Sequence, residues 1–405
     1  MLFLDKYNIH KVLLINPNFP TKKHSSSTYN VLPIGLLKIG SYLKHNNVEV
    51  SLVNLCIESD IPSNFFPDLI MITSLFSWYG LPVKQAVEEA RKLYPNTPII
   101  VGGIWASMEP DVCQKYTQCD EIYQGVMFEA ESIPLDYTLL NYHVDFQILH
   151  TSRGCTKKCS YCNIPKTEPQ LHFKNTIKNE IMRRNIILYD NNFLSNPNVN
   201  NILDEFIDLK KRKMITSIHC LSGFDKYYLT RQPELAQKIK QAGFSKIHIA
   251  WDEGFNKASV VKKAVELFVQ AGYSRRNISV FLLYNYNIDF DESEKKRIFL
   301  FKLGVRPFST RFRPSSQHHD NFNPNINQTN QDYYISPLWT DELVKQFRRN
   351  CKNHIFCILH GLKFYSPSLY KNKVKMQEYR HLGITEVNNI VKDCWNPLLY
   401  NGGLL

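Results

Sequence analysis

The stretch Lys11-Val12-Leu13-Leu14-Ile15-Asn16, closed by Pro17, is a continuous apolar run of strand length. Segments with apolar residues at helical spacing follow at 34–45 and 83–94. Between and after them lie further strand-like runs, at 49–55, 69–74, 98–102 and, in a short form, 121–123. Strands that are apolar throughout and alternate with helices form a parallel sheet covered on both faces. Residues 1–140 are therefore predicted to form a doubly wound α/β domain.

In such a sheet the ligand crevice lies outside the carboxyl ends of the strands. Three short segments follow predicted strands of this domain and are expected at that edge: Asn16-Pro17-Asn18, Ser74-Leu75-Phe76 and Gly102-Gly103-Ile104-Trp105.

The strand–helix pattern restarts near residue 148. Six strand-like runs are found at 147–151, 185–189, 217–221, 246–250, 279–284 and 304–308. Helical patterns separate them at 200–211, 232–242, 259–271 and 291–303. Six β/α units predict a partial barrel over residues 141–315, open on one side. Residues 316–405 are expected to begin with an exposed loop at 317–331 and a helix at 340–351, followed by an irregular, aromatic-rich extension.

A cluster of cysteines follows the first strand of the predicted barrel, in Arg153-Gly154-Cys155-Thr156-Lys157-Lys158-Cys159-Ser160-Tyr161-Cys162. The spacing is C-x3-C-x2-C. Three clustered thiolates can hold three irons of a [4Fe–4S] cluster and leave the fourth open to a small molecule. A closed structural zinc site would need a fourth ligand, and the next cysteine is Cys220. The seven other cysteines are predicted to be ordinary buried thiols: Cys56, Cys113, Cys119, Cys220, Cys351, Cys357 and Cys394.

This stretch resembles the radical S-adenosylmethionine (SAM) superfamily, with Tyr161 at its aromatic position. The resemblance implies that Cys155, Cys159 and Cys162 ligate the cluster and that SAM binds its open iron. Reductive cleavage of SAM would then give a 5′-deoxyadenosyl radical, which abstracts hydrogen from an inert C–H bond. The resemblance also implies a small electron donor, such as flavodoxin or ferredoxin.

The N-terminal segment resembles the Rossmann-like, cobalamin-binding-type domain that precedes the barrel in class B radical SAM enzymes. The resemblance rests on Asn16-Pro17, on 32–36 (LPIGL), on Pro67-Asp68 and on 101–103 (VGG). It implies that cobalamin lies against a set of residues at the strand ends: Ser74, Gly102, Gly103 and Trp105.

Two departures leave cobalamin binding open. The D-x-H-x-x-G motif that supplies a histidine to cobalt is absent, and Trp105 follows where relatives often have histidine. The indole of Trp105 either packs against a corrin face or fills an empty crevice in a domain that has lost its cofactor.

Carboxylates and amides follow successive strands of the predicted barrel, and such positions face one cavity. The residues predicted to contact SAM are therefore Tyr161, Asp190, Asp225, Asp252 and Asn285. For Asp190, capping of its own loop is an equal alternative. His219 and His248 lie inside strand patterns, where a histidine is more often a core residue than an acid or base.

The leading hypothesis is a radical SAM enzyme that modifies an unactivated carbon, by methyl transfer if cobalamin binds. Without cobalamin, the reaction would be an epimerisation, cross-link or rearrangement. A second hypothesis is a methylthiotransferase acting on tRNA or protein, which Cys162-Asn163-Ile164-Pro165 resembles. That group holds a second cluster on three N-terminal cysteines, and Cys56, Cys113 and Cys119 do not occupy the required turn. A third is a non-catalytic, metal-stabilised nucleic-acid-binding protein. The substrate, whether peptide, nucleic acid or small metabolite, stays open.

Composition agrees with a globular protein of more than one domain, since 43% of the 405 residues are hydrophobic and 13% aromatic. The formal net charge of +12 suits nucleic acid or anionic ligands, but no long Lys/Arg block is present. No apolar run reaches the roughly 18 residues of a membrane span. Residues 1–6 are too short an apolar run for a signal peptide, so a reducing cytoplasm is expected.

Overall fold

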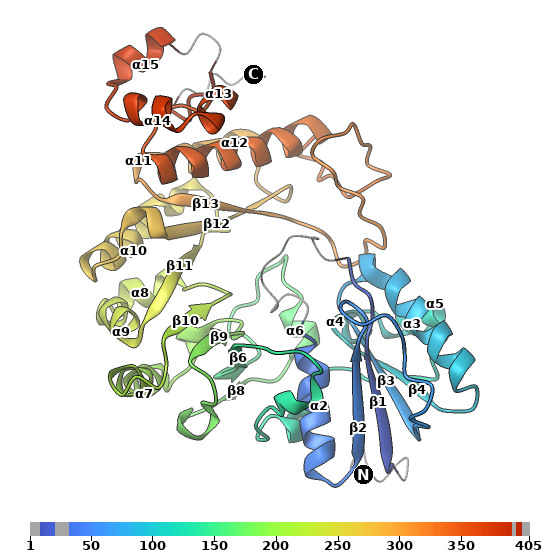
Figure 1. Ribbon diagram of the computed structural model, residues 1–405. Helices are drawn as coiled ribbons and strands as arrows, with labels where there is room; N and C mark the ends of the chain where they lie inside the picture. The colour runs from blue at the N-terminus through green and yellow to red at the C-terminus, as the bar shows by residue number, and fades with distance from the viewer. Residues whose placement is uncertain (1–8, 21–31, 391–393, 399–405) are drawn as a thin grey trace. The chain divides into compact units, whose positions relative to one another are not determined.

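The computed structural model of the protein describes residues 9–20, 32–390 and 394–398 (Figure 1). The expected lack of a signal peptide concerns residues outside this described part. The chain divides into two compact units. The first unit holds residues up to 148 together with 153–172 and 314–321, and the second holds 149–152, 173–313 and the residues from 322 onward. The predicted domain boundaries at 140 and 315 stay predictions.

The sheet of the first unit has five strands in the order β2-β1-β3-β4-β5, and its four pairings are all parallel. The strands are β1 Lys11–Asn16, β2 Glu49–Asn54, β3 Leu69–Ser74, β4 Ile99–Gly103 and β5 Glu121–Ile122. The connecting helices are α2 Ile34–His45, α3 Gly80–Leu93, α4 Ile104–Met108 and α5 Pro110–Thr117. The predicted parallel α/β sheet is confirmed. Its strand order reverses between β1 and β3, which is where such folds place their ligand crevice.

Burial on both faces explains the unbroken apolar run that opens the chain. Val12, Leu13, Leu14 and Ile15 are all fully buried in β1. Because successive strand residues point to opposite faces, a strand at the centre of a covered sheet has no solvent-facing position.

A six-stranded sheet has the order β13-β12-β11-β10-β9-β6. Strands β9 to β13 lie in the second unit, and β6 spans the division between residues 148 and 149. The four pairings from β9 to β13 are parallel. The strands are β6 Phe146–Leu149, β9 Asn185–Leu188, β10 Ser217–Cys220, β11 Phe244–Ala250, β12 Ile278–Tyr284 and β13 Arg306–Arg311. The helices between them are α7 Val199–Lys211, α8 Lys226–Arg231, α9 Glu234–Ala242, α10 Ala258–Gln270 and α11 Phe290–Lys302. The predicted alternation of helices with parallel strands is confirmed, and the partial barrel stays a prediction.

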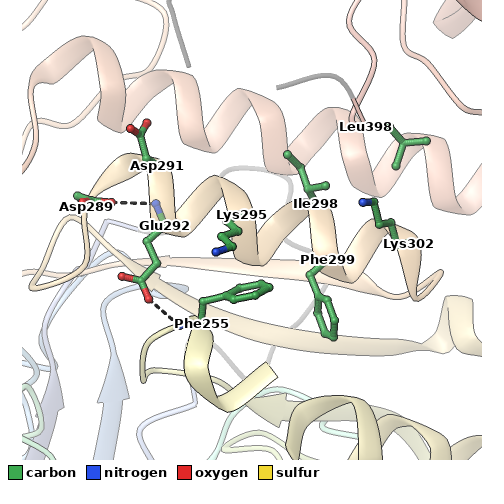
Figure 2. A pocket seen from close by; sticks show the side chains of 9 residues that line it. All are labelled: Phe255, Asp289, Asp291, Glu292, Lys295, Ile298, Phe299, Lys302 and Leu398. Carbon is green, nitrogen blue, oxygen red and sulfur yellow. Dashed lines mark hydrogen bonds between the residues drawn. The ribbon is translucent and has the colours of Figure 1, made fainter. Parts of the chain in front are cut away.

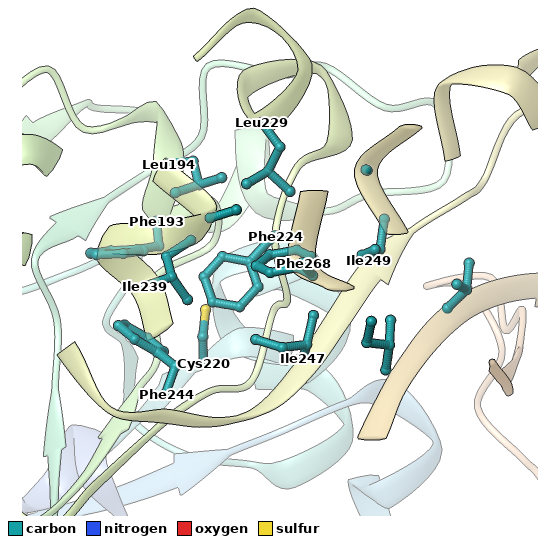
Figure 3. Packing of buried hydrophobic residues seen from close by; sticks show 14 of the residues in the cluster. Phe193, Leu194, Cys220, Phe224, Leu229, Ile239, Phe244, Ile247, Ile249 and Phe268 are labelled. Atoms are coloured by element: carbon teal, nitrogen blue, oxygen red, sulfur yellow. The ribbon is translucent and has the colours of Figure 1, made fainter. Parts of the chain in front are cut away.

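One face of this sheet packs on the helices. Cys220, Ile247 and Ile249 lie in a large buried cluster with Phe224 of the β10–α8 loop and Phe268 of α10 (Figure 3). Since side chains alternate along a strand, the residues between these core positions point to the sheet's other face.

The C-terminal part is more helical than predicted. Helix α12, Asp341–His360, runs nine residues beyond the predicted end at 351, and α13 Pro367–Lys371, α14 Lys373–Tyr379 and α15 Ile384–Ile390 follow it. The prediction of an irregular extension was therefore wrong. The helix continues because Cys351, His354 and Cys357 form one buried face. It ends at Gly361, whose φ of 69° is left-handed and closes the last turn.

Short elements complete the described chain: β7 Ser152–Arg153, α6 Ile164–Thr167, β8 His172–Phe173 and the 3₁₀ turns η2 Ser77–Tyr79, η3 Phe128–Ala130, η4 Tyr137–Leu139, η5 Lys178–Glu180, η6 Phe193–Ser195, η7 Phe255–Lys257 and η8 Arg275–Asn277. Among the helices described, none has the length and apolar character of a membrane-spanning segment.

Candidate functional site

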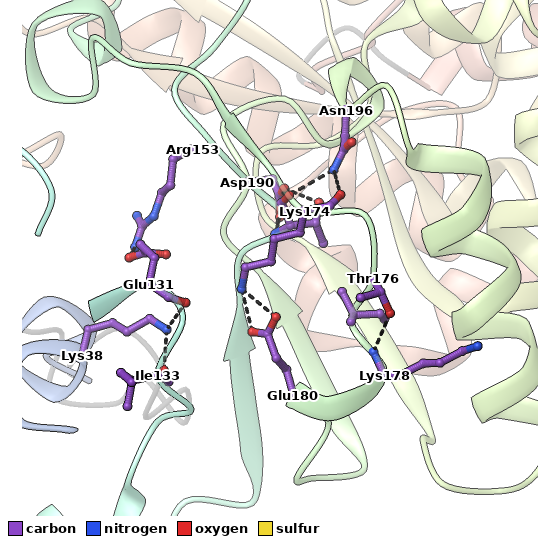
Figure 4. A network of polar contacts seen from close by, with 12 residues as sticks. Lys38, Glu131, Ile133, Arg153, Lys174, Thr176, Lys178, Glu180, Asp190 and Asn196 are labelled. Atoms are coloured by element: carbon purple, nitrogen blue, oxygen red, sulfur yellow. Dashed lines mark hydrogen bonds and ion pairs between the residues drawn. The ribbon is translucent and has the colours of Figure 1, made fainter. Parts of the chain in front are cut away.

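The cysteine loop, residues 154–163, lies in the first unit between β7 and α6 and has no regular secondary structure. Ion pairs fix the residue that precedes it. Arg153 Nη2 lies 2.7 Å from Glu131 Oε1, and Arg153 Nη1 lies 3.4 Å from Glu168 Oε1 (Figure 4). The Gly154 amide donates to Glu168 Oε2 at 2.8 Å. Both carboxylates are mostly buried, so these charge-assisted contacts hold the start of the loop firmly.

Glycine is required at position 154. Its φ is +74°, and a Cβ there would lie 2.5 Å from the Gln170 carbonyl oxygen. The Gly–Cys pair of the motif therefore has a local structural cause: the chain turns sharply beside α6 before it reaches the first cysteine.

The three loop cysteines differ from most of the others. Cys155, Cys159 and Cys162 are half-buried and in no disulfide bond. Five other cysteines are buried: Cys113, Cys119, Cys220, Cys351 and Cys357. Burial raises the pKa of each of these thiols, to about 12 for Cys113, Cys220 and Cys357. The prediction of buried thiols is confirmed for these five, whereas Cys56 and Cys394 are half-buried, like the loop cysteines.

The three loop cysteines fit iron–sulfur ligation in donor type, because cysteine thiolates are the usual ligands of such clusters. They are not gathered. In the described part of the chain, no group of three or more His, Cys, Asp or Glu side chains is close enough to hold a metal ion.

Asp190 binds a neighbouring segment of the chain and not its own loop, and its predicted contact with SAM stays a prediction. It is buried after β9, and its carboxylate accepts from the Thr151 amide at 3.1 Å, the Thr151 hydroxyl at 2.6 Å and the Ser152 hydroxyl at 2.7 Å. Burial raises the pKa of Asp190, although these hydrogen bonds act in the opposite direction. The residue thus fixes the end of the strand that leads into the cysteine loop (Figure 4).

The other residues predicted to contact SAM have structural contacts as well. Asp225 caps α8 by accepting from the Tyr227 amide at 2.9 Å. Asn285, fully buried and at a left-handed φ of 62°, binds the Tyr334 carbonyl and the Ser336 amide.

Asp252 lies between two residues whose carbonyls accept from the buried Lys296 ammonium, each at 2.9 Å. Tyr161 is half-buried within the cysteine loop. Asp190, Asp225, Asp252 and Asn285 lie in the second unit and Tyr161 in the first.

The residues predicted to contact cobalamin also have internal explanations. A Cβ on Gly103, where φ is +98°, would lie 2.2 Å from the Ser74 carbonyl oxygen. The Ser74 hydroxyl donates to the Gly102 carbonyl at 2.7 Å and accepts from the Ala106 amide at 3.1 Å. Gly103 is therefore needed for close packing of β4 on β3, whatever ligand lies outside.

Trp105 is 1% exposed and belongs to the core of the first unit. Its indole N–H donates to Glu109 at 3.2 Å, and its ring packs edge-on against Tyr116. Of the two predicted roles, this arrangement corresponds to an indole that fills space inside the domain.

An aromatic platform follows β3, and only its first residue, Phe76, was placed at this edge from the sequence. It consists of Phe76, Trp78 and Tyr79, all half-buried. Phe76 and Trp78 stack with ring centroids 4.6 Å apart and planes 12° apart, and Phe19, after β1, lies 6.0 Å from Tyr79. These rings follow the two strands between which the sheet order reverses. Three aromatic residues within four positions after a strand, F-S-W-Y, were the available signal.

The exposed loop predicted at 317–331 begins in contact with this region. The Ser77 hydroxyl, within the platform segment, donates to the carbonyls of Ser315 at 2.6 Å and Gln317 at 2.5 Å. The His318 ring lies 6.5 Å from Trp105. These residues all belong to the first unit.

A surface pocket of about 730 Å³ lies beside α11 in the second unit (Figure 2). Its polar groups serve the fold. Asp289 caps α11 by accepting from the Glu292 amide, Glu292 accepts from the Phe255 amide, and the Lys295 ammonium lies 4.4 Å from the Phe255 ring centroid. None of the residues predicted to bind a cofactor lines this pocket.

Comparison with known proteins supports the cobalamin-binding-type N-terminal segment, because residues 25–134 match the family model of the B12 binding domain. No curated protein sequence matches the chain. Among solved structures, the chain is similar to active domain 2 of a chitinase from Pyrococcus furiosus, a catalytic site mutant, at 7% identity and a TM-score of 0.28, over 85% of this chain and 96% of that one. It is also similar to the carboxyl transferase domain of Rhizobium etli pyruvate carboxylase with pyruvate, at 11% identity and a TM-score of 0.22, over 96% of this chain and 56% of that one. At these TM-scores neither likeness indicates a shared fold.

Proposed function

We propose that the protein is a cobalamin-dependent radical SAM enzyme that transfers a methyl group to an unactivated carbon. One observation carries the proposal: a segment that matches the B12 binding domain precedes a C-x3-C-x2-C loop in the same chain. When bound, the cluster supplies the electron that cleaves SAM and cobalamin supplies the methyl carrier.

The cluster would be held by Cys155, Cys159 and Cys162. Since these thiols are not gathered, the loop must close around the cluster as it binds. We propose that the start of the loop stays fixed during that closure. Arg153 and Gly154 anchor the loop's start through Glu131 and Glu168.

Cobalamin would lie on the aromatic platform Phe76–Tyr79, with Phe19 beside it. Flat, half-exposed rings suit a flat macrocycle, because they offer apolar area with little loss of side-chain freedom. Gly103 and Ser74 support this edge from inside by holding β4 against β3.

The test is anaerobic reconstitution with iron, sulfide and hydroxocobalamin, followed by absorption spectra, metal analysis and an assay for 5′-deoxyadenosine. We expect one cluster and one corrinoid per chain. Trp78→Ala should weaken corrinoid retention at least tenfold and leave cluster content unchanged. Phe66→Ala is the matched control, since Phe66 is an aromatic residue of the same unit that is 74% exposed.

Each other outcome contradicts a defined part of the proposal. A cluster without corrinoid would remove methyl transfer and leave a radical SAM enzyme. Two clusters would indicate a methylthiotransferase, which the structure does not favour, since Cys113 and Cys119 are buried. Protein that binds zinc but no cluster would contradict the enzyme altogether.

A further inference from the structure

A row of polar side chains crosses the six-stranded sheet on the face that does not pack on helices. His248 of β11 is in register with Ser279 of β12, which is in register with Arg306 of β13. On the other side, Lys246 of β11 is in register with His219 of β10. Register partners in a parallel sheet point to the same face. These five residues, all in the second unit, form what we call the polar face.

The two histidines of the polar face form a close pair. Their Nε2 atoms are 3.3 Å apart and their ring centroids 5.5 Å apart. The Phe281 ring stacks on His248, with centroids 5.1 Å and planes 16° apart, and Phe308 meets His248 edge-on. His248 is 9% exposed, and its Nδ1 is buried without a hydrogen-bond partner. One side of the pair is therefore unsatisfied.

Both histidines are neutral at pH 7. Burial lowers the pKa of each to about 4, and the charge of Lys246 acts in the same direction on both. For His248, the neighbouring His219 and the charge of Arg306 lower the pKa further. One imidazole N–H must then donate to the lone pair of the other ring. The remaining ring nitrogens are left to bind something else.

The cations of the polar face lack counter-charges. Neither Arg306 nor Lys246 forms an ion pair with a residue that the structure describes. Arg306 is half-buried and its Nε is buried without a partner, and this burial lowers the pKa of Arg306. Elsewhere the fold supplies partners: Arg153 contacts Glu131 at 2.7 Å, and Arg297 is paired with a buried glutamate at 2.6 Å. An unpaired, partly buried guanidinium is costly unless a ligand compensates it.

We propose that the polar face binds the oxyanion of a small molecule, a carboxylate or a phosphate group, with Arg306 and Lys246 as charge partners and the His219–His248 pair as hydrogen-bond donor. Guanidinium, ammonium and imidazole N–H groups are all donors, and no carboxylate is among their register partners. Two neutral imidazoles also suit a transition metal, but the two nearby cations oppose a divalent ion. The site depends on the second unit alone and needs neither the cluster nor cobalamin.

The test uses the full chain with histidines isotopically labelled, titrated in separate arms with inorganic phosphate and with acetate at constant ionic strength. Bound anion favours the imidazolium, so we expect a saturable rise of one unit or more in the apparent pKa of the histidine pair. The arm that saturates at the lower concentration identifies phosphate or carboxylate as the ligand group. Arg306→Gln should abolish the rise, and Arg276→Gln should preserve it, because Arg276 is an exposed arginine of the same unit.

Thermal unfolding gives a second, ligand-free readout. Arg306→Met removes an uncompensated charge from a partly buried position, so the melting temperature should rise, whereas Arg276→Met should leave it unchanged. A fall in melting temperature for Arg306→Met would show that the guanidinium stabilises the fold and would overturn the proposal.

Two further results would also overturn it. One is the absence of a saturable response to either anion, or an equal response in Arg306→Gln. The other is a tetrahedral cobalt(II) absorption spectrum in the wild type that is lost in His248→Ala, which would mark a metal site. Because cluster content and SAM cleavage are measured separately, failure here leaves the proposed radical SAM function untouched, and the reverse holds equally.

Discussion

The two sheets treat their polar residues in opposite ways. In the first unit, polar groups at the strand ends satisfy one another: the Asn16 amide donates to Asn54 Oδ1 at 2.7 Å, and Ser74 binds the backbone of Gly102 and Ala106. In the second unit, Arg306 carries a charge and a buried N–H with no partner in the described chain. A polar residue whose partners lie within the chain therefore supports the fold, whereas one without such partners is a candidate to bind a ligand. Neither the residue type nor its position on a strand makes this distinction.

The same distinction separates the cysteines. Thiols such as Cys351 and Cys357 are buried in packed helices, where ionisation is unfavourable. The loop thiols are half-buried on a segment without regular secondary structure, whose first residues contact Glu131 and Glu168. The buried His248 Nδ1 and Arg306 Nε on the sheet, and the half-buried thiols of the loop, are the places where we propose that ligands bind.

The largest expected effect is on the cysteine loop. Cys159→Ala should abolish cluster assembly, because a cubane with two protein thiolates is not retained, and 5′-deoxyadenosine formation should fall below detection. Iron and sulfide content with the absorption spectrum of the reconstituted protein measure the effect. Cys56→Ala is the control, because Cys56 is a half-buried thiol of the same unit that accepts a hydrogen bond from the Asn16 side chain. Equal loss in both variants would contradict the assignment of the loop thiols.

The next effect tests whether Gly103 serves the fold. Gly103→Ala should cost about 4 kcal/mol of unfolding free energy, since the added methyl would overlap the Ser74 carbonyl at a strained φ. Gly35→Ala is the matched control: nothing lies within 4 Å of its Cβ, and alanine in a helix should stabilise by about 0.5 kcal/mol. Denaturant unfolding compares the two. A stable Gly103→Ala protein that only loses corrinoid would instead place Gly103 against the cofactor.

Much of the fold was predictable because burial leaves a pattern in the sequence. The bounds of β1 and β3 agree with their apolar runs, since both strands are covered on two faces. Helix α12 was predicted too short, because polar residues within 352–356 interrupt the apolar pattern of the sequence. The buried face of this part of the helix is formed by Cys351, His354 and Cys357.

The candidate site was less predictable, because the spacing of residues in the sequence does not show which side chains or ligands they contact in the fold. Gly103 and Trp105 were expected to contact a macrocycle, and the structure gives them neighbours from their own domain. His248 is buried, as expected for a core residue, but it is not satisfied. That fact depends on the register of β10 and β11, which no local pattern encodes.

A smaller effect concerns pH and tests the polar face. The pKa of His219 and His248 is about 4 in the fold and 6.5 ordinarily, so the unfolded chain binds more protons between these values. The contribution of these two histidines to the free energy of unfolding is therefore fully present above pH 6.5. It is lost as the pH falls from 6.5 to 4. Because His219 is only half-buried and the two rings interact, the pair should contribute less than the sum of two independent, fully buried histidines.

The contribution of the histidine pair to stability is measured by urea unfolding between pH 6.5 and 4. It is the difference in unfolding free energy between the wild type and a His219→Gln, His248→Gln double variant. We expect the double variant to lose less stability on acidification. Parallel curves would mean that the two histidines have the same pKa in the folded and unfolded chain, and that neither burial nor the charges of Lys246 and Arg306 lower it.

The smallest effect separates capping from cofactor binding at Asp225. Asp225→Ala removes the acceptor for the Tyr227 amide at the start of α8 and should cost about 1 kcal/mol. Asp225→Ser restores a capping oxygen without the charge, so stability should recover. SAM affinity, measured by equilibrium binding to reconstituted protein, then decides the role. If Asp225 only caps, Asp225→Ser binds SAM like the wild type. A stable Asp225→Ser protein with affinity reduced tenfold would mean that the carboxylate contacts SAM, and the second sheet would then have ligand groups at its strand ends as well as on its polar face.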